Sequence, residues 1–380
     1  MELKRLQLED LHKSLGAQMV PFAGWEMPVV YSSIAEEHMA VREAAGLFDI
    51  SHMGEILIRG KDAMSFLQWM TTNDVSKLSA EGVVGAQYST ALNERGGIRD
   101  DIFVYMLERN KYMVVANAVN TEKIYNWFVE HRRGDVEISD ITMTTVMLAL
   151  QGPKAIEVLQ KLTSFDLSSI KRFNAAWVEF NGTRVLASRT GYTGEDGFEL
   201  YLLNETRSNP KRAEKLWSDI LCAGEAFSVK PCGLGARDTT RLEAGLVLYG
   251  NDIDENITPL EAKIGFVVKF EKGDFIGREA LLAQKAAGVS KTRVGMRMLD
   301  RGIPRHGYKV LRGGKEIGVV TSGTLSPLLN VGIAMGYVPP EVKVGDKLQI
   351  EIHGKPREAE VVSLPFYDPN KYGYARKKDD

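Results

Sequence analysis

The hydrophobic pattern of the first 140 residues changes repeatedly between helical and strand spacing. Ser33-Ile-Ala-Glu36 matches a capping box and predicts a helix over residues 33–45. Asn120 is expected to cap another helix, which ends before Gly134. Apolar spacing predicts a further helix over 62–70 and strands over 55–59, 87–92, 101–107, 112–116 and 136–139. A small α+β unit resembling a ferredoxin-like sandwich fits residues 50–140.

The middle of the chain mixes strands with helices, and the end is rich in strands. Asn181-Gly182 predicts a tight hairpin turn, and Pro153 is expected in the first turn of a helix. The other predicted elements are strands over 147–150, 177–180, 183–188 and 198–202 and helices over 211–223 and 236–244. From Lys291 to Leu364, short strands and glycine-rich turns predict a small β-barrel or sandwich. Residues 375–380 are expected to form a charged, frayed tail.

Composition narrows the class of protein without identifying it. The chain has 380 residues, enough to bury a sizeable core, and a net charge of −2 that argues against a nucleic acid as its main partner. Two cysteines and six dispersed histidines give no disulfide framework and no clustered zinc site, so no metal is expected. No apolar run approaches ~18 residues and no signal segment is recognised, so we expect a cytoplasmic protein with no membrane partner.

Two adjacent acids open one of the predicted strands. Because side chains alternate along a strand, Asp101 should share a face with Phe103 and Tyr105, and Asp100 should lie on the opposite face. For Asp100, capping of the preceding Gly96-Gly97 turn is favoured. For Asp101, a solvated strand end and a carboxylate that orients or polarises a nitrogen in an aromatic pocket are equally compatible with the pattern.

A glycine-rich stretch over 191–197 predicts a bent loop that allows close approach of other groups. Glu199 follows it on a predicted strand, on the face opposite Phe198 and Leu200. Its carboxylate could accept two parallel hydrogen bonds from a guanidine-like heterocycle, but this stretch alone favours an acid that faces water. Glu195 and Asp196 are expected to serve the turn.

Arg237 and Arg241 are four residues apart and therefore lie on one face of a predicted helix. Two cations so close repel unless acids or an anion lie opposite. For Arg241 we slightly favour structural salt bridges to Asp238, Glu243 or Asp252. For Arg237 we slightly favour contact with an anion or ligand near the helix start.

Ten segments in a fixed order make the chain resemble the aminomethyltransferase (T-protein) family of the glycine cleavage system. They cover nearly the whole chain, and their joint order is far more specific than any one glycine motif. The segments are Phe22-Ala-Gly-Trp25-Glu-Met-Pro28, Phe48-Asp-Ile-Ser-His52-Met53-Gly-Glu55, Asn93-Glu-Arg-Gly-Gly97-Ile-Arg-Asp-Asp101, Leu150-Gln-Gly-Pro153, Arg189-Thr-Gly-Tyr-Thr-Gly-Glu-Asp-Gly197, Leu234-Gly-Ala-Arg-Asp238, Arg241-Leu-Glu-Ala-Gly245, Tyr249-Gly-Asn-Asp-Ile-Asp254, Thr321-Ser-Gly323 and Gly336-Tyr-Val-Pro339.

The resemblance implies a three-domain, cloverleaf-like α+β fold around a central funnel for tetrahydrofolate. The implied domains are a discontinuous folate-binding α+β domain with antiparallel Greek-key character (1–50 plus 141–280), a ferredoxin-like domain (51–140) and a C-terminal, jelly-roll-like β-barrel domain (281–380). It also implies the reaction, in which the methylene of an aminomethyl-lipoyl arm on a lipoylated H-protein passes to tetrahydrofolate. The products are 5,10-methylenetetrahydrofolate, ammonia and dihydrolipoyl H-protein, and neither metal nor flavin is required.

Site residues carry over from the family position by position. Asp101 matches the catalytic aspartate, and Met53 matches an apolar contact to the pterin. The tail after Leu364 is longer than the family pattern, and Tyr372 is the residue chosen for its contact. The remaining folate-pocket positions are Tyr88, Asn117, Tyr192, Glu199 and Arg237.

Two other functions share this fold. A folate-dependent demethylase of a small methylated amine or sulfur compound needs no lipoyl partner. Gly96-Gly97 followed by Asp100-Asp101, together with Tyr249-Gly-Asn-Asp252, favours the transferase over it. A folate-binding module that aids iron–sulfur maturation carries a Lys-Gly-Cys segment, which Pro231-Cys232-Gly233 does not match.

Overall fold

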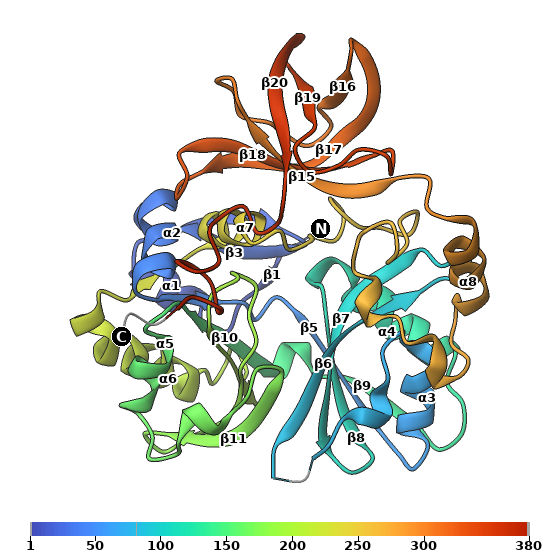
Figure 1. Cartoon of the computed structure of the whole chain (residues 1–380). Coiled ribbons are helices and arrows are strands. Elements are labelled where there is room, and N and C mark those ends of the chain that lie inside the picture. The colour runs from blue at the N-terminus through green and yellow to red at the C-terminus, as the bar shows by residue number, and fades with distance from the viewer. Residues whose placement is uncertain (1, 81, 378–380) are drawn as a thin grey trace.

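The computed structural model describes residues 2–80 and 82–377 (Figure 1). The predicted elements occur in it in the predicted order, together with others that the pattern did not predict. The helices are α1 (Glu9–Ser14), α2 (Ile34–Glu43), α3 (Ala63–Met70), α4 (Thr121–Glu130), α5 (Ala155–Gln160), α6 (Lys211–Gly224), α7 (Leu234–Glu243) and α8 (Arg278–Ala287). The strands of the first half are β1 (Lys4–Arg5), β2 (Gln18–Phe22), β3 (Trp25–Val30), β4 (Gly46–Asp49), β5 (Gly54–Arg59), β6 (Val84–Leu92), β7 (Ile98–Glu108), β8 (Lys111–Ala116), β9 (Glu137–Asp140) and β10 (Thr145–Gln151). The strands of the second half are β11 (Asn174–Phe180), β12 (Thr183–Ser188), β13 (Gly197–Leu203), β14 (Lys230–Pro231), β15 (Thr292–Met298), β16 (Lys309–Arg312), β17 (Lys315–Ser326), β18 (Val331–Val338), β19 (Lys347–Ile352) and β20 (Lys355–Val362).

Local sequence signals fix several of these boundaries. The Ser33 side chain accepts a hydrogen bond from the Glu36 amide at 3.2 Å, which confirms the predicted start of α2. Asn181 and Gly182 have φ values of 44° and 82° and join β11 to β12, so the predicted hairpin is also confirmed. Asn120 precedes α4 as expected, but its side chain makes no capping hydrogen bond and donates instead to Asp100.

Eleven strands form one large sheet, which has two halves. The first half has the order β6-β7-β8-β5-β9, with antiparallel pairing throughout. Strands β7, β8, β5 and β9 with α3 and α4 reproduce the ferredoxin-like arrangement, and β6 extends it at one edge. Apolar side chains of α3 and α4 cover one face of this half through a core that includes Phe66, Ile102 and Phe128. The predicted ferredoxin-like unit is therefore present.

The other half of the sheet has the order β14-β4-β10-β13-β12-β11 and is covered by α5 and α6. Strand β11 pairs with β6 through Asn174↔Gly85 and Ala175↔Val84, so one sheet of eleven strands runs through both predicted units. The second faces of the two halves share a core that includes Tyr105 and Leu57 from one half and Tyr201 from the other. We call this shared region the inner layer. Helices α5 and α6 lie on one outer flank, and α3 and α4 lie on the other (Figure 1).

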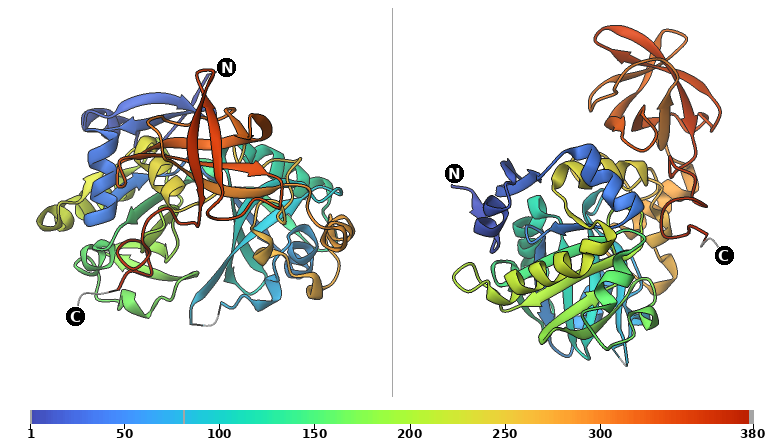
Figure 2. Two further views of the ribbon diagram at one scale, coloured as in Figure 1. Left: turned by 45° about the horizontal axis from the view of Figure 1, so that its top comes forward. Right: turned by 90° about the vertical axis from the view of Figure 1, so that its left-hand side faces the viewer.

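The C-terminal part closes into a six-stranded barrel of order β15-β18-β17-β16-β19-β20. It stands above the rest of the molecule as a separate lobe (Figure 2). Helix α7 packs against it, and Arg241 of α7 donates to the Ser322 hydroxyl of β17 at 2.9 Å. The predicted α+β fold class with a C-terminal barrel is confirmed, whereas the residue limits of the three domains remain a prediction.

The segment after β20 packs against the sheet-bearing part of the molecule, and this contact extends into residues 375–377, the described part of the predicted frayed tail. The chain returns from the barrel to the part of the molecule that holds the large sheet and α7. There the Phe366 amide donates to the Glu243 carbonyl at 2.8 Å, and the Tyr374 amide donates to the Gly194 carbonyl at 2.9 Å. Arg376 forms an ion pair with Glu195. The expectation for residues 375–380 is thus wrong for Arg376, and residues 378–380 lie outside the described part.

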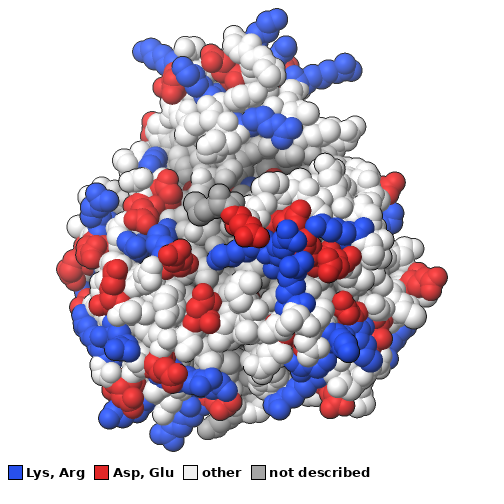
Figure 3. All heavy atoms as spheres, turned by 180° about the vertical axis from the view of Figure 1, so that it is seen from behind, with Lys and Arg blue, Asp and Glu red and all other residues white. Residues whose placement is uncertain are grey.

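Acidic and basic side chains are interspersed over the back face of the molecule (Figure 3). This distribution agrees with the balanced composition of 48 basic and 50 acidic residues. Within the described residues, no helix is both long and apolar enough to cross a membrane.

The core beneath β10 gives a stability prediction. Leu148 is 0% exposed within a core shared with α5 and α6, so Leu148→Ala should lower the free energy of unfolding by ~2–5 kcal/mol, measured by urea denaturation. Leu15→Ala, at a leucine that is 41% exposed, serves as the control and should change it by less than ~0.5 kcal/mol. Equal effects of the two variants would contradict this description of the core.

Candidate functional site

Strands β6, β7, β8 and β5 carry the predicted polar residues on the face that borders the inner layer. The register places Tyr88 beside Phe103, Phe103 beside Val115, and Val115 beside Glu55. Paired residues of neighbouring strands point to the same side of a sheet, so these four side chains form one row. Asp101 lies two residues from Phe103 and therefore on the same face, as the alternation predicted.

Asp101 is held by two neutral donors, both of which were predicted site residues. The Tyr88 hydroxyl donates to Asp101 Oδ2 at 2.8 Å, and Asn117 Nδ2 donates to Asp101 Oδ1 at 2.8 Å. The side chain of Asp101 remains partly exposed, yet burial still raises the pKa of its carboxyl. A carboxylate with fixed oxygens in a poorly solvated position suits interaction with a nitrogen that gains positive charge.

Asp100 does not cap the preceding turn, and that expectation is wrong. Asn93 closes the turn instead, since its Oδ1 accepts from the amides of Arg95 and Gly97 at 3.0 Å each. Asp100 is 0% exposed and accepts hydrogen bonds from the chain that follows β8, including the Asn117 amide at 2.9 Å. Burial, followed by the charge of Asp101, raises the pKa of Asp100 to about 8.

Glu199 reaches the inner layer from the other half of the sheet. Its strand, β13, lies between β10 and β12, and Glu199 is only 7% exposed, so the favoured expectation of a solvated acid is wrong. Thr190 donates to its carboxylate at 2.5 Å, and burial raises its pKa. A hydrogen bond of 3.1 Å between the Tyr105 and Tyr201 hydroxyls joins the two halves next to it.

The two arginines of α7 have different environments. Arg241 forms ion pairs with Asp238 at 2.8 Å and with Asp252 at 2.7 Å, which confirms two of its three expected partners. The guanidinium of Arg237 lies over the ring of Tyr192 at 4.6 Å, and among the described residues the Arg237 side chain has no ion pair or hydrogen bond. Burial lowers the pKa of Arg237, so its charge would be stabilised by an anionic group of a ligand.

Glu195 does not serve the turn alone, contrary to expectation. It is buried and pairs with Arg42 at 3.1 Å, and it accepts from the Gly373 amide at 3.0 Å and from Arg376. Asp196 lies beside it and pairs with Arg189 rather than only shaping the loop. The loop that carries Tyr192 is thereby tied to the returning tail.

Two predicted folate contacts lie at the margins of this arrangement. Met53 is one residue before the Gly54↔Ala116 pair, which places it next to Asn117, and it packs against the inner-layer core. Tyr372 packs on Tyr367 with ring centroids 6.3 Å apart. None of the contacts found for it among the described residues joins it to the other predicted site residues.

Several neighbouring residues were not predicted as site residues. Phe103 contacts the ring of Tyr88 at 5.6 Å and stacks on Phe173 at 6.1 Å, while Phe266 is 67% exposed and lies 6.4 Å from Tyr88. Strand alternation placed Phe103 correctly, whereas Phe173 is in a turn and Phe266 in a short 3-10 helix (Gly265–Val267), and neither has a sequence signal. His52 is buried, and burial together with the charge of Arg237 lowers its pKa to about 3.

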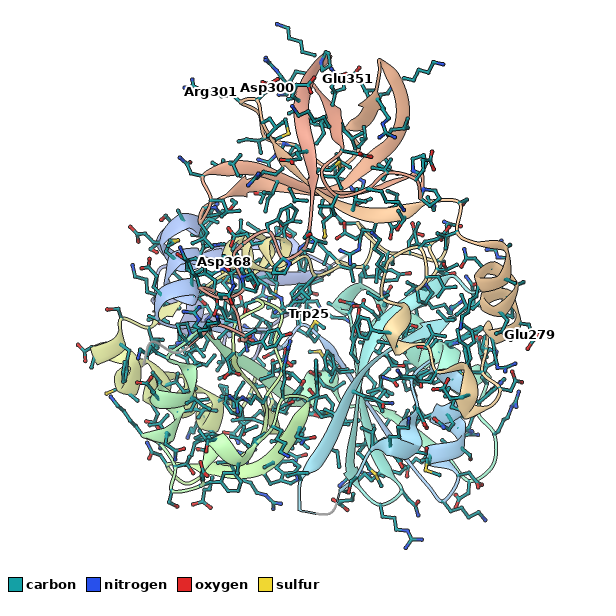
Figure 4. The ribbon with its side chains drawn as sticks, in the orientation of Figure 1. Trp25, Glu279, Asp300, Arg301, Glu351 and Asp368 are labelled. Atoms are coloured by element: carbon teal, nitrogen blue, oxygen red, sulfur yellow. The ribbon has the colours of Figure 1, made fainter. Side chains whose placement is uncertain are left out.

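No cluster of three or more His, Cys, Asp or Glu side chains suited to a metal ion occurs in the part of the chain that the structure describes. Trp25, at the centre of the molecule in Figure 4, packs with Leu6 and Met27 in a small core of its own. Leu234, the first residue of α7, packs against the same core and links it to the helix that carries Arg237.

Comparison with known proteins gives consistent matches over the full length. Residues 8–272 match the GCVT N-terminal domain, and residues 291–368 match the glycine cleavage T-protein C-terminal barrel domain. This chain belongs to the glycine cleavage T-protein family. A Geobacillus kaustophilus protein described as an aminomethyltransferase is 50% identical over 96% of this chain and 99% of its own.

Two further relatives support the same family. A Pyrococcus horikoshii protein described as a probable aminomethyltransferase is 47% identical over 99% of this chain and all of its own. The crystal structure of glycine cleavage system aminomethyltransferase T from Bartonella henselae has a TM-score of 0.88 at 36% identity, covering 98% of this chain and 99% of its own. The resemblance found in the sequence is confirmed, and with it the assignment to a family of aminomethyltransferase enzymes.

The environment of His52 in this T-protein family member predicts a pH dependence of stability. The unfolded chain binds a proton at histidine near pH 6.5, whereas folded His52 does so only near pH 3. The free energy of unfolding should therefore fall as pH falls from about 6.5 to 3, by at most ~1.4 kcal/mol per pH unit from this residue. His52→Gln should reduce that slope in urea denaturation and leave the two curves parallel above pH 7. Identical slopes in both proteins would contradict the prediction.

Proposed function

We propose that this chain catalyses the aminomethyl transfer step of glycine cleavage. The methylene of the aminomethyl-lipoyl arm of a lipoylated H-protein passes to tetrahydrofolate, which gives 5,10-methylenetetrahydrofolate, ammonia and dihydrolipoyl H-protein. The observation that carries the proposal is the Asp101 carboxylate, fixed by Tyr88 and Asn117 on the sheet face that borders the inner layer. The family membership of the chain supports the same reaction.

The residues around Asp101 fit a reduced folate. Glu199 offers a buried carboxylate for the amino edge of a pterin, and Arg237 offers a guanidinium that forms no ion pair among the described residues. The rings of Tyr88 and Tyr192 combine an apolar face with a polar tip, which suits a flat heterocycle. Met53 adds an apolar contact, and Tyr372 remains a proposed contact from the tail. When bound, the folate supplies the nitrogen nucleophiles that accept the carbon.

Asp101 would stabilise charge in the transition state electrostatically and would not act as a nucleophile. Its carboxylate would orient the pterin and stabilise the positive charge that develops on the attacking nitrogen. Tyr88 and Asn117 already hold both of its oxygens, so little reorganisation is needed during the reaction. Burial of the surrounding inner layer would keep water from the reactive carbon, which hydrolysis would otherwise divert to formaldehyde.

The folate-dependent demethylase is the other function considered, and it would use the same folate contacts. The family matches and the relatives described as aminomethyltransferases favour the transferase over it. Both activities need folate, and they differ in the donor of the one-carbon unit.

The decisive experiment mixes the protein with tetrahydrofolate and aminomethylated, lipoylated H-protein. We expect ammonia release that requires both components, with 5,10-methylenetetrahydrofolate formed in equal amount. Omission of either component is the control. Release of a one-carbon unit from a small methylated amine or sulfur compound, without H-protein, would favour the demethylase instead.

The role of Asp101 is tested by Asp101→Asn, which keeps the shape of the side chain and removes its charge. Turnover should fall by about 10²–10³-fold, the usual loss when one preorganised electrostatic group is removed. Asp346→Asn, on the barrel surface beside Arg312, is the matched control and should retain full turnover. Circular dichroism should show that both variants are folded. Near-normal activity of Asp101→Asn would contradict the assignment of Asp101 as the catalytic carboxylate.

A further inference from the structure

We propose that Asp100 is a positioning residue for the transfer reaction, acting on Asp101 through the shared side-chain amide of Asn117. The inference rests on the proposed function, because it assumes that Asp101 is the catalytic carboxylate. Asp100 and Asp101 point to opposite faces of β7, so direct contact between the two side chains is not what connects them. The amide that follows β8 reaches both.

The geometry of that amide is specific. Asn117 Nδ2 lies 2.8 Å from Asp100 Oδ1, 2.8 Å from Asp101 Oδ1 and 3.1 Å from the Asp101 carbonyl oxygen. The backbone amide of Asn117 donates to the other oxygen of Asp100, Oδ2, at 2.9 Å. Asp100 therefore holds Asn117 at two points, and the side chain so fixed donates to Asp101.

A third donor completes the environment of Asp100. Asn120 Nδ2 donates to Asp100 Oδ1 at 2.5 Å, and this explains why Asn120 is buried instead of capping α4 with its side chain. Asp100 thus organises the whole connection from β8 to α4. Among the described residues, its charge also acts on two further titratable groups, Lys123 of α4 and Tyr249.

A buried carboxyl with three N–H donors could have a purely structural role, but two features favour a role of Asp100 in positioning Asp101. Asp100 is fully buried next to a second acid, which is an unfavourable arrangement unless each acid has its own donors. The only side chain found to donate to both acids, among the described residues, is Asn117, itself a proposed folate-pocket residue. Loss of Asp100 should therefore release Asn117 and leave Asp101 Oδ1 without its fixed donor, while the Tyr88 bond to Oδ2 persists.

The test is a double-mutant cycle with Asp100→Asn, Asn117→Ala and the double variant, with kcat and the KM for tetrahydrofolate measured in the H-protein assay. Asp100→Asn should lower kcat on the order of tenfold to a hundredfold through misplacement of Asp101, with a smaller effect on KM. The double variant should be no more than about threefold worse in kcat/KM than Asn117→Ala alone, because both changes remove the same contact. Multiplicative losses would overturn the proposal.

Asp49→Asn is the matched control for structural damage. Asp49 is also a buried acid, bonded to His12 at 2.7 Å and to Ser51, but it lies on β4 in the other half of the sheet. Combined with Asn117→Ala, it should give losses that multiply. Coupling of Asp49→Asn to Asn117→Ala as strong as that of Asp100→Asn would show a general structural effect and overturn the proposal.

A milder variant covers the case in which Asp100→Asn does not fold. Asn120→Ala removes one donor to Asp100 without touching Asp101, and it should lower kcat and show the same coupling to Asn117→Ala. Its independence from Asn117→Ala would count against the proposal. Failure of the proposed function looks different, since the unmodified protein would then release no ammonia from aminomethylated H-protein and tetrahydrofolate, whatever the coupling of Asp100.

Discussion

Burial of two sheet faces against each other is the constraint on which the rest of this structure depends. The halves of one eleven-stranded sheet enclose the inner layer, so polar groups there must be paired with partners or with a ligand. Tyr105 and Tyr201 pair across it, and Thr190 donates to Glu199 nearby. Arg237 has no such partner among the described residues, and an anionic ligand group would supply one.

A second buried group ties the site to the distant parts of the chain. Arg42 of α2 lies between Glu195 and Glu243, at 3.1 and 3.0 Å, and its guanidinium stacks on the ring of Tyr367. Glu243 also accepts from Ser326 of the barrel. Such buried ion pairs add little net stability over an apolar core, but removal of one partner is strongly destabilising. We interpret this network as a device that fixes the Tyr192 loop, α7, the barrel and the tail in one arrangement.

The sequence predicted which face of a strand a residue occupies better than it predicted whether that residue is buried. Period-2 alternation placed Asp101 and Phe103 on one face and Glu199 opposite Phe198, because that rule depends only on the backbone. Burial could not be predicted in the same way. Asp100 was expected to cap a turn, and Glu199 was expected to face water. Both are buried, because residues far along the chain cover them. Arg376 likewise finds its partner, Glu195, only because the tail returns from the barrel.

The sequence by itself determined many of the strands, helices and turns, the α+β class with its terminal barrel, and the family, because these depend on local pattern and on motif order. Only the tertiary structure decided that β11 joins β6 and that the two half-sheets face each other. It also decided that one amide, that of Asn117, touches both adjacent acids. The physical reason is that pairing between distant strands and desolvation of charges are set by packing over long sequence separations, which no local pattern records.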